Sequence, residues 1–142
     1  MELGIWNWDI FGIKKMFFMN YKGYKELESY IKARELRISI SELVKKFPAS
    51  EKFQLISQII RSSRSITANI AEGYGRFTYT DTRHFFIIAR GSTTETMEHL
   101  TTAFDEKYIV EDELNLFDEK CQTIIKLING YINFLDKSKA TK

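Results

Sequence analysis

The sequence has one cysteine and one proline, and it has no long apolar run. The lone Cys121 excludes an intramolecular disulfide. His84 and His99 lie too far apart for a zinc-ligand set. A membrane-spanning helix needs roughly 18–20 apolar residues in a row, and none occurs. We therefore expect a cytoplasmic protein with no metal, no cofactor and no contact with a membrane.

Low proline and glycine contents argue against linkers and favour one globular domain in this chain of 142 residues. The net charge of +2 predicts no partner, but its distribution is uneven. Residues 52–90 carry six basic and two acidic side chains, whereas residues 95–119 carry nine acidic side chains and one lysine. This asymmetry indicates either two surfaces of opposite sign or simply two solvated helix faces.

Apolar residues recur at helical spacing over four segments, 24–46, 51–71, 81–107 and 111–137. Pro48 separates the first two segments, Ser50 and Thr80 are candidate N-caps, and Gly73 is a candidate helix stop with positive φ. The stripes predicted to face the core are, in chain order, Leu36, Ile40, Leu43, Val44, Phe47; Leu55, Ile59, Ser63, Ile66, Ile70; Phe85, Ile88, Ala89, Ser92, Thr96, Leu100, Phe104; and Phe117, Cys121, Ile124, Ile128, Tyr131, Leu135.

Four long amphipathic helices with short connections predict an all-α fold, an antiparallel up-down-up-down four-helix bundle over 24–137 with a short tail at 138–142. Residues 1–23 form an aromatic-rich extension. The sequence leaves open whether it is a packing arm, a partner-binding arm or a stretch upstream of a start at Met19. Apolar residues outside the fourth stripe, including Ile125, Leu127 and Ile132, suggest cover by another subunit.

The segment "EGYGRF" contains Gly-x-Gly, but no strand precedes it, and its glycines follow a helix C-terminus, where the dipole is negative. A nucleotide cradle is therefore not expected. Glu72 and Glu95, with His84 or His99, have no spacing that forces them around a pocket. We accordingly predict no catalytic residues and no enzymatic activity.

Small and polar residues gather where the second helix would meet the third. Gly91 lies inside a predicted helix, where glycine costs roughly 1 kcal/mol relative to alanine, so a close helix–helix approach is expected there. We predict a tight packing node between the two helices, with these members: Asn69, Glu72, Gly73, Ala89, Gly91, Ser92 and Glu95.

Five arginines are the candidate binding residues: Arg61, Arg64, Arg76, Arg83 and Arg90. Residues three or seven apart share a helix face, so these would form a basic stripe beside Tyr74 and Phe77. Arginine next to aromatic rings suits RNA or single-stranded nucleic acid. The alternative is a solvated surface held by salt bridges.

The motifs "ANIAEGYGR" at 68–76 and "ARGSTTE" at 89–95 closely resemble the two signature segments of the four-helix-bundle proteins of the 23S rRNA intervening-sequence type. Asn69, Ile70, Ala71, Glu72 and Gly73 match the first pattern; Ala89, Gly91, Ser92 and Glu95 match the second. The resemblance runs from about residue 24 to 135. The threonines at 93, 94 and 96 depart from the usual apolar residues, and the N-terminal extension has no counterpart.

The resemblance implies a ring-like homopentamer with no known enzymatic activity, encoded within bacterial large-subunit rRNA genes. A related branch, the accessory variability determinant proteins of diversity-generating retroelements, binds a reverse transcriptase and nucleic acid. Two hypotheses follow. The protein is an oligomer associated with RNA, or it is an interaction scaffold for a protein such as a reverse transcriptase.

Overall fold

A computed structural model describes residues 6–8, 14–16 and 23–140. Two short strands, β1 (Trp6–Trp8) and β2 (Lys14–Met16), pair antiparallel, with Trp6 opposite Met16 and Trp8 opposite Lys14. The sequence analysis did not predict this hairpin. The remainder of residues 1–22 lies outside the described residues, so the three alternatives for the extension stay open.

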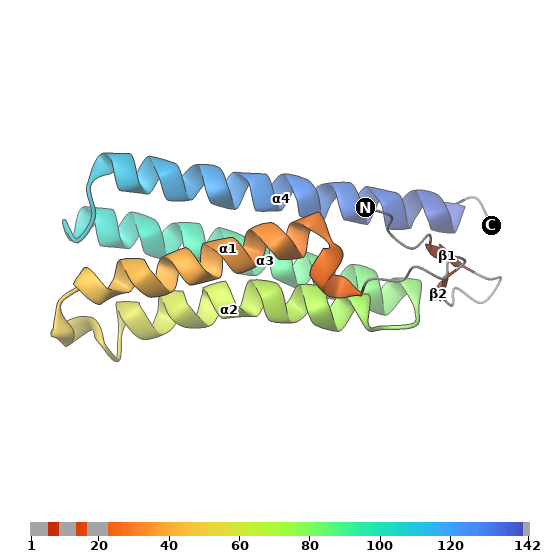
Figure 1. Cartoon of the computed structure of the whole chain (residues 1–142), viewed down its shortest axis with the longest axis horizontal. Helices are drawn as coiled ribbons and strands as arrows, with labels where there is room; N and C mark the ends of the chain where they lie inside the picture. Colours follow the sequence, from red (N-terminus) through yellow and green to blue (C-terminus); the bar gives the residue numbers. More distant parts are fainter. Residues whose placement is uncertain (1–5, 9–13, 17–22, 141–142) are drawn as a thin grey trace.

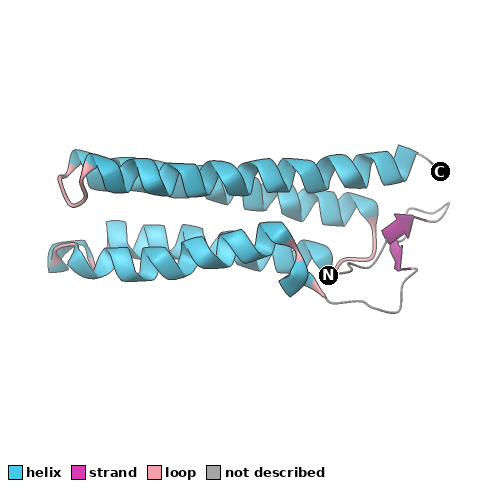
Figure 2. Ribbon diagram, turned by 45° about the horizontal axis from the view of Figure 1, so that its top comes forward, coloured by secondary structure: helices cyan, strands magenta, loops and turns pink. Residues whose placement is uncertain are grey.

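The bundle consists of four helices: α1 (Glu28–Leu43), α2 (Leu55–Tyr74), α3 (Tyr79–Asp105) and α4 (Glu111–Ala140). Short 3-10 turns precede α1 at Tyr24–Glu26 and connect α1 to α2 at Val44–Lys46 and Ala49–Glu51. Successive helices run antiparallel, and each packs against two neighbours (Figures 1 and 2). The predicted four-helix bundle is confirmed. Among the described residues, no helix combines the length and apolarity of a membrane span.

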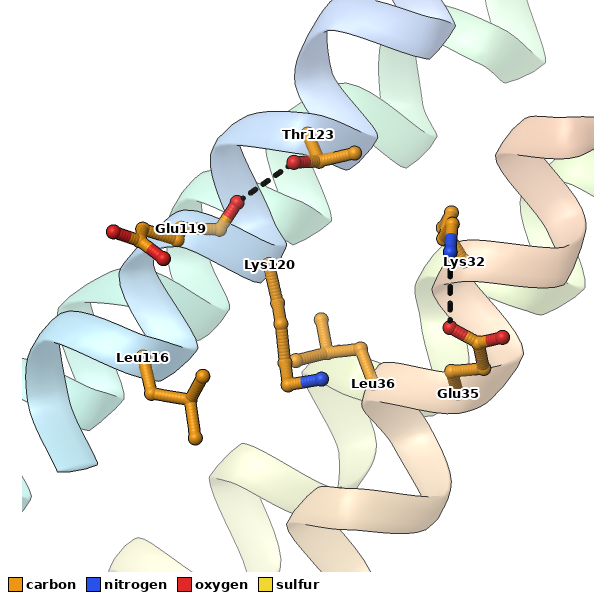
Figure 3. Close-up of a pocket in the computed structure, with 7 residues that line it drawn as sticks. All are labelled: Lys32, Glu35, Leu36, Leu116, Glu119, Lys120 and Thr123. Atoms are coloured by element: carbon orange, nitrogen blue, oxygen red, sulfur yellow. Dashed lines mark hydrogen bonds and ion pairs between the residues drawn. The ribbon is translucent and has the colours of Figure 1, made fainter.

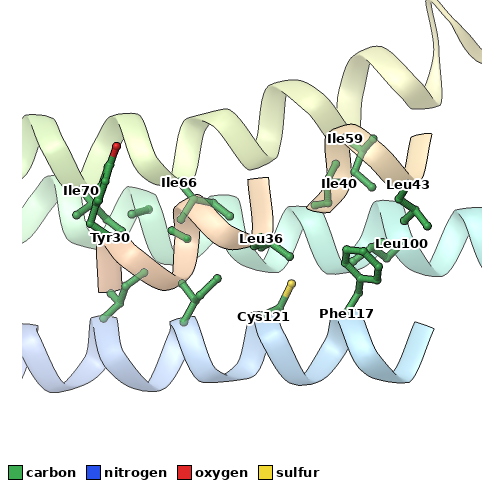
Figure 4. Packing of buried hydrophobic residues seen from close by; sticks show 14 of the residues in the cluster. Tyr30, Leu36, Ile40, Leu43, Ile59, Ile66, Ile70, Leu100, Phe117 and Cys121 are labelled. Carbon is green, nitrogen blue, oxygen red and sulfur yellow. The ribbon is translucent and has the colours of Figure 1, made fainter. Parts of the chain in front are cut away.

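The core runs along the bundle axis and contains the predicted stripes of α1 and α2 in full (Figure 4). On α4, Phe117, Cys121, Ile124, Ile128 and Leu135 are buried as predicted, but Ile132 is buried where Tyr131 was expected. Burial raises the pKa of the Cys121 thiol to about 12, so this cysteine is a core residue and not a nucleophile.

The inner face of α3 is rotated from its prediction. Ala89, Ser92, Thr96 and Leu100 are buried, but Ile88 is 36% exposed and Phe85 is only partly buried. Their places are taken by four other residues: Thr82, Phe86, Thr93 and Ala103. These buried hydroxyls are all hydrogen-bonded: Thr93 and Thr96 donate to carbonyls one turn earlier on the helix, and Thr82 donates to the carbonyl of Arg76.

The predicted helix boundaries need three corrections. Gly73 does not stop α2, which continues to Tyr74 and ends at Gly75 with a negative φ of −79°. Ser50 lies in a 3-10 turn and does not cap α2. The cap of α3 is Thr78, not Thr80, and its hydroxyl accepts the N–H of Asp81 at 3.3 Å.

Gly73 is required for a close approach of α2 to α3. A Cβ at this position would lie 2.9 Å from the Cβ of Phe85 and 3.1 Å from the carbonyl oxygen of Thr82. Glycine therefore permits the contact by lacking a side chain, and its freedom to adopt positive φ is not used. The predicted place of Gly73 in the packing between these two helices is thus confirmed, and only its role as a helix stop is wrong.

Candidate nucleic-acid interface

The five predicted arginines do not form one stripe. Arg61 and Arg64 lie exposed on the outer side of α2. Arg83 and Arg90 lie on the flank of α3 that faces α4, where Arg83 Nε donates to Asp136 Oδ1 at 2.9 Å and Arg90 Nη1 donates to Asn129 Oδ1 at 2.7 Å. The α3 arginines therefore bind α4.

The cluster around Asp136 fastens the start of α3 to the end of α4. Tyr79 donates its hydroxyl proton to Asp136, and Lys139 lies 5.7 Å from the Tyr79 ring centroid. The hydrogen bond from Tyr79, with that from Arg83, holds the pKa of Asp136 below its usual value. Burial and the Asp136 carboxylate raise the pKa of Tyr79. Each shift favours the ionisation state in which these hydrogen bonds form.

Arg76 occupies the connection between α2 and α3. Its Nη2 donates to Glu72 Oε1 at 2.5 Å, and its guanidinium lies 4.8 Å from the Phe85 ring centroid. Phe77 is 72% exposed and accessible to a base, but Tyr74 is only 5% exposed. Tyr74 therefore packs into the core and cannot stack on a base, contrary to the sequence prediction.

The α2–α3 contact contains a polar node whose composition differs from the predicted one. Asn69 Nδ2 donates to Ser65 Oγ at 2.9 Å, and Ser65 Oγ is 2.9 Å from Ser92 Oγ. A second link joins Ser62 Oγ to Thr96 Oγ1 at 2.8 Å. The two serines of α2, missed from sequence, precede Asn69 at helical spacing on the flank that faces α3, and this spacing was the available signal.

Of the other predicted members, Glu72, Glu95 and Gly91 lie outside this node. Glu72 and Glu95 are exposed and interact along their own helices, Glu72 with Arg76 and Glu95 with His99 at 3.2 Å. Ala89 is fully buried. Gly91 is exposed, and a Cβ built there would have no atom of the described chain within 4 Å, so close packing inside the bundle does not explain it.

A shallow depression of about 200 Å³ lies between α1 and α4 (Figure 3). Its lining is Lys32, Glu35, Leu36, Leu116, Glu119, Lys120 and Thr123, which includes none of the candidate residues. No group of three or more His, Cys, Asp or Glu side chains within the described part of the chain is arranged to hold a metal. The candidate arginines therefore lie outside this depression.

Two further arginines, Arg34 and Arg37, lie on α1 and were absent from the predicted set. The charge count from 52 to 90 omitted them because they precede it in the chain. Their spacing of three residues, the same as that of Arg61 and Arg64, was the signal that could have identified them.

These features define the class of the protein as a four-helix bundle whose candidate interface is an arginine-bearing helical surface. The model of the family "23S rRNA-intervening sequence protein" matches residues 25–130, and the chain belongs to this family. The structure is also similar to the crystal structure of a protein with unknown function from the S23 ribosomal protein family of Bacteroides thetaiotaomicron VPI-5482. The TM-score is 0.69 at 27% identity, covering 74% of this chain and 95% of that one. A search of curated proteins finds no match.

Proposed function

We propose that this protein is a non-enzymatic, cytoplasmic, oligomeric protein that associates with RNA. The observation that carries the proposal is the state of Arg61 and Arg64, which are exposed and form no ion pair with another described residue. An unpaired guanidinium can bind phosphate without first losing a carboxylate partner. Membership of the 23S rRNA-intervening sequence family makes RNA the first ligand to test.

The test is a fluorescence anisotropy titration of the purified protein with labelled fragments of structured rRNA. Because phosphate contacts release counterions, the affinity is expected to fall steeply as salt increases. The double variant Arg61→Gln/Arg64→Gln is expected to bind more weakly and with a shallower salt dependence. Absence of binding by the unmodified protein at low salt would reject the proposed function.

We further propose that the oligomer is a homopentameric ring, with the outer face of α3 at the subunit contact. Gly91 lies in mid-helix, which costs about 1 kcal/mol relative to alanine, and its surroundings in the chain leave room for a side chain. Ile88, one turn earlier, is 36% exposed. Close approach of a second copy would account for both residues.

Multi-angle light scattering measures this directly and is expected to give five times the chain mass. Gly91→Met should dissociate the oligomer because its side chain would occupy the contact. Gly130→Met is the matched control, since Gly130 is also exposed in mid-helix with no described atom within 4 Å of an added Cβ. A monomeric wild-type protein, or equal effects of both variants, would reject this interface.

The alternative function is a scaffold that binds a protein such as a reverse transcriptase without contacting nucleic acid. The observation in its favour is the end of the bundle at the α3–α4 connection, where Val110 is 62% exposed among exposed Asp105, Glu106, Glu111 and Asp112. Co-purification from host cells tests it by comparing Val110→Asp with the unmodified chain. A specific protein lost with Val110→Asp would support the scaffold.

A further inference from the structure

Arg34 and Arg37 lie on the flank of α1 that faces α2. The opposite flank faces α4, because Lys32 and Leu36 line the depression against α4 and Lys46, just beyond α1, pairs with an α4 carboxylate. At 100° per residue, Arg37 and then Arg34 follow the buried face on its other side. Arg34 is exposed and Arg37 is partly buried.

Arg64 lies on the flank of α2 that faces α1. The flank of α2 toward α3 is fixed by the hydrogen bonds of Ser62 and Ser65 to α3 hydroxyls. Helical rotation places Arg64 on the other side of the buried face, and Arg61 follows it on the outer surface. The two arginine pairs therefore lie on adjoining surfaces of neighbouring helices.

The two pairs also lie at the same level along the bundle. Figure 4 shows Tyr30 of α1 near Ile70 of α2 at one end, and Ile40 near Ile59 toward the other, as expected for antiparallel helices. Arg34 and Arg37 lie between Tyr30 and Ile40 along α1. Arg61 and Arg64 lie between Ile59 and Ile70 along α2. Packed helices have axes about 8–10 Å apart, so rotation and level together place the two pairs on adjoining sides of α1 and α2.

We call this surface the arginine face; its members are Arg34, Arg37, Arg61 and Arg64. No member forms an ion pair with another described residue. The single acid of α2, Glu72, pairs with Arg76. The acids of α1, Glu28, Glu35 and Glu42, are seven residues apart and so follow one line of the helix, and Glu35 places that line toward α4. The positive charge of the arginine face is therefore uncompensated.

One member of the arginine face has a buried donor that lacks a partner. The Nε atom of Arg37 is inaccessible to solvent and has no hydrogen-bond acceptor among the described residues. Leaving a buried charged donor unsatisfied is costly, and such groups in native proteins generally have partners. Because a solvent-sized atom cannot reach this Nε, a bound anion would have to contact the terminal Nη groups of Arg37 instead.

We propose that the arginine face binds the phosphodiester backbone of a nucleic acid, an inference that rests on the proposed RNA-associated function and locates its site. The guanidinium group matches phosphate with two parallel hydrogen bonds, and four such groups would contact successive phosphates along the strand. Backbone contacts position a strand without distinguishing its bases, so binding at this face is largely independent of sequence. Arg76, Arg83 and Arg90 contribute little because their guanidinium groups already have partners on the protein.

The experiment compares two double variants that remove equal charge. Arg34→Gln/Arg37→Gln removes half of the arginine face, and Arg83→Gln/Arg90→Gln removes two arginines that are engaged with α4. Anisotropy titrations use single-stranded RNA and DNA of the same sequence across a salt series. The face variant should lose about tenfold or more in affinity, and its salt slope should fall by about one per arginine. The control variant, Arg83→Gln/Arg90→Gln, should lose much less affinity.

A third variant, Arg34→Gln/Arg61→Gln, changes only exposed members and so tests the face even if replacement of Arg37 disturbs folding. Circular dichroism establishes that each variant is folded. Equal losses on RNA and DNA would assign the contacts to phosphate and support the face, whereas a loss confined to RNA, with binding to DNA retained, would contradict phosphate contacts at this face. Binding by the unmodified protein that both face variants retain would overturn this inference while leaving the proposed function standing. Failure of the unmodified protein to bind either strand would reject the function itself.

Discussion

The same substitution, glycine to alanine, should change stability in opposite directions at Gly73 and Gly91. Gly91 lies in mid-helix, where alanine gains about 1 kcal/mol from helix propensity, and Gly73 lies in the last turn of α2, where this gain is no larger. At Gly91 the added methyl meets no described atom within 4 Å, and the gain should be retained. At Gly73 the added methyl would lie 2.9 Å from Phe85 Cβ, closer than real Cβ contacts, and 3.1 Å from the carbonyl oxygen of Thr82.

The magnitude at Gly73 follows from what the methyl contacts. Two of the three nearest atoms, Phe85 Cβ and the carbonyl oxygen of Thr82, move only with the α3 backbone. Overpacking of a core costs about 1–3 kcal/mol, and atoms fixed to the backbone place this site near the upper end. After the propensity gain is subtracted, Gly73→Ala should lower the free energy of unfolding by about 1–2 kcal/mol.

Urea denaturation followed by circular dichroism measures both variants, at protein concentrations below any self-association because Gly91 lies at the proposed subunit contact. Gly130→Ala is a second exposed control and should stabilise the chain as Gly91→Ala does. The reasoning would be refuted if Gly73→Ala were as stable as the unmodified protein, since the α2–α3 approach would then tolerate a methyl group.

Three further predictions concern single side chains. Asp136→Asn should destabilise the protein at neutral pH, and its deficit should shrink below about pH 4, because a depressed carboxyl pKa contributes stability that is lost as pH falls through the folded pKa. Asp118→Asn is the opposite-sign control, since burial raises the pKa of Asp118 and its neutral replacement should cost nothing at neutral pH; equal pH profiles of the two variants in denaturant titrations would contradict the assignment. Thr96→Val should cost about 1 kcal/mol in urea unfolding by removing the hydroxyl link to Ser62, whereas Thr94→Val, on the exposed side, should be near neutral; similar costs would argue against the polar node. Cys121 should react with a chromogenic thiol reagent only as fast as the protein unfolds, and rapid labelling of the native protein would show that the thiol is accessible.

Helical periodicity predicted the bundle because buried apolar positions recur at every turn of each long helix, so the pattern is sampled many times. The stripes of α1 and α2 were correct throughout, since consistently apolar positions leave little choice of face. On α3 the prediction chose Phe85 and Ile88 from the continuous apolar run at 85–89, where hydrophobicity alone does not distinguish one helix face from the next. The buried face is set by Phe86 and by threonines whose hydroxyls are satisfied within the helix, which a hydrophobic pattern does not detect.

Local motifs were less reliable where tertiary contacts determine the outcome. Gly73 followed by Gly75 has the pattern of a helix end, yet the close contact with α3 holds Gly73 inside the helix. Glu72 and Glu95 match the family motifs but point to solvent, and the hydrogen-bonded node is made by Asn69, three serines and a threonine. Whether Gly73 stops the helix or packs, and whether the glutamates are buried or exposed, depends on how α3 lies against α2. Neither segment contains that information by itself.

The arginines illustrate the same limit at the candidate site. In the sequence, Arg61 with Arg64 and Arg83 with Arg90 are equivalent, since each pair shares a helix face. What separates them is the helix that lies opposite. Across from α3, α4 presents Asp136 and Asn129, which bind Arg83 and Arg90. Across from α2, α1 carries Arg34 and Arg37, and no described residue forms an ion pair with Arg61 or Arg64. One arginine pair therefore holds α3 to α4, and the other remains available to a ligand. Because Arg61 and Arg64 have no ion-pair partner to lose, their replacement should change binding more than stability.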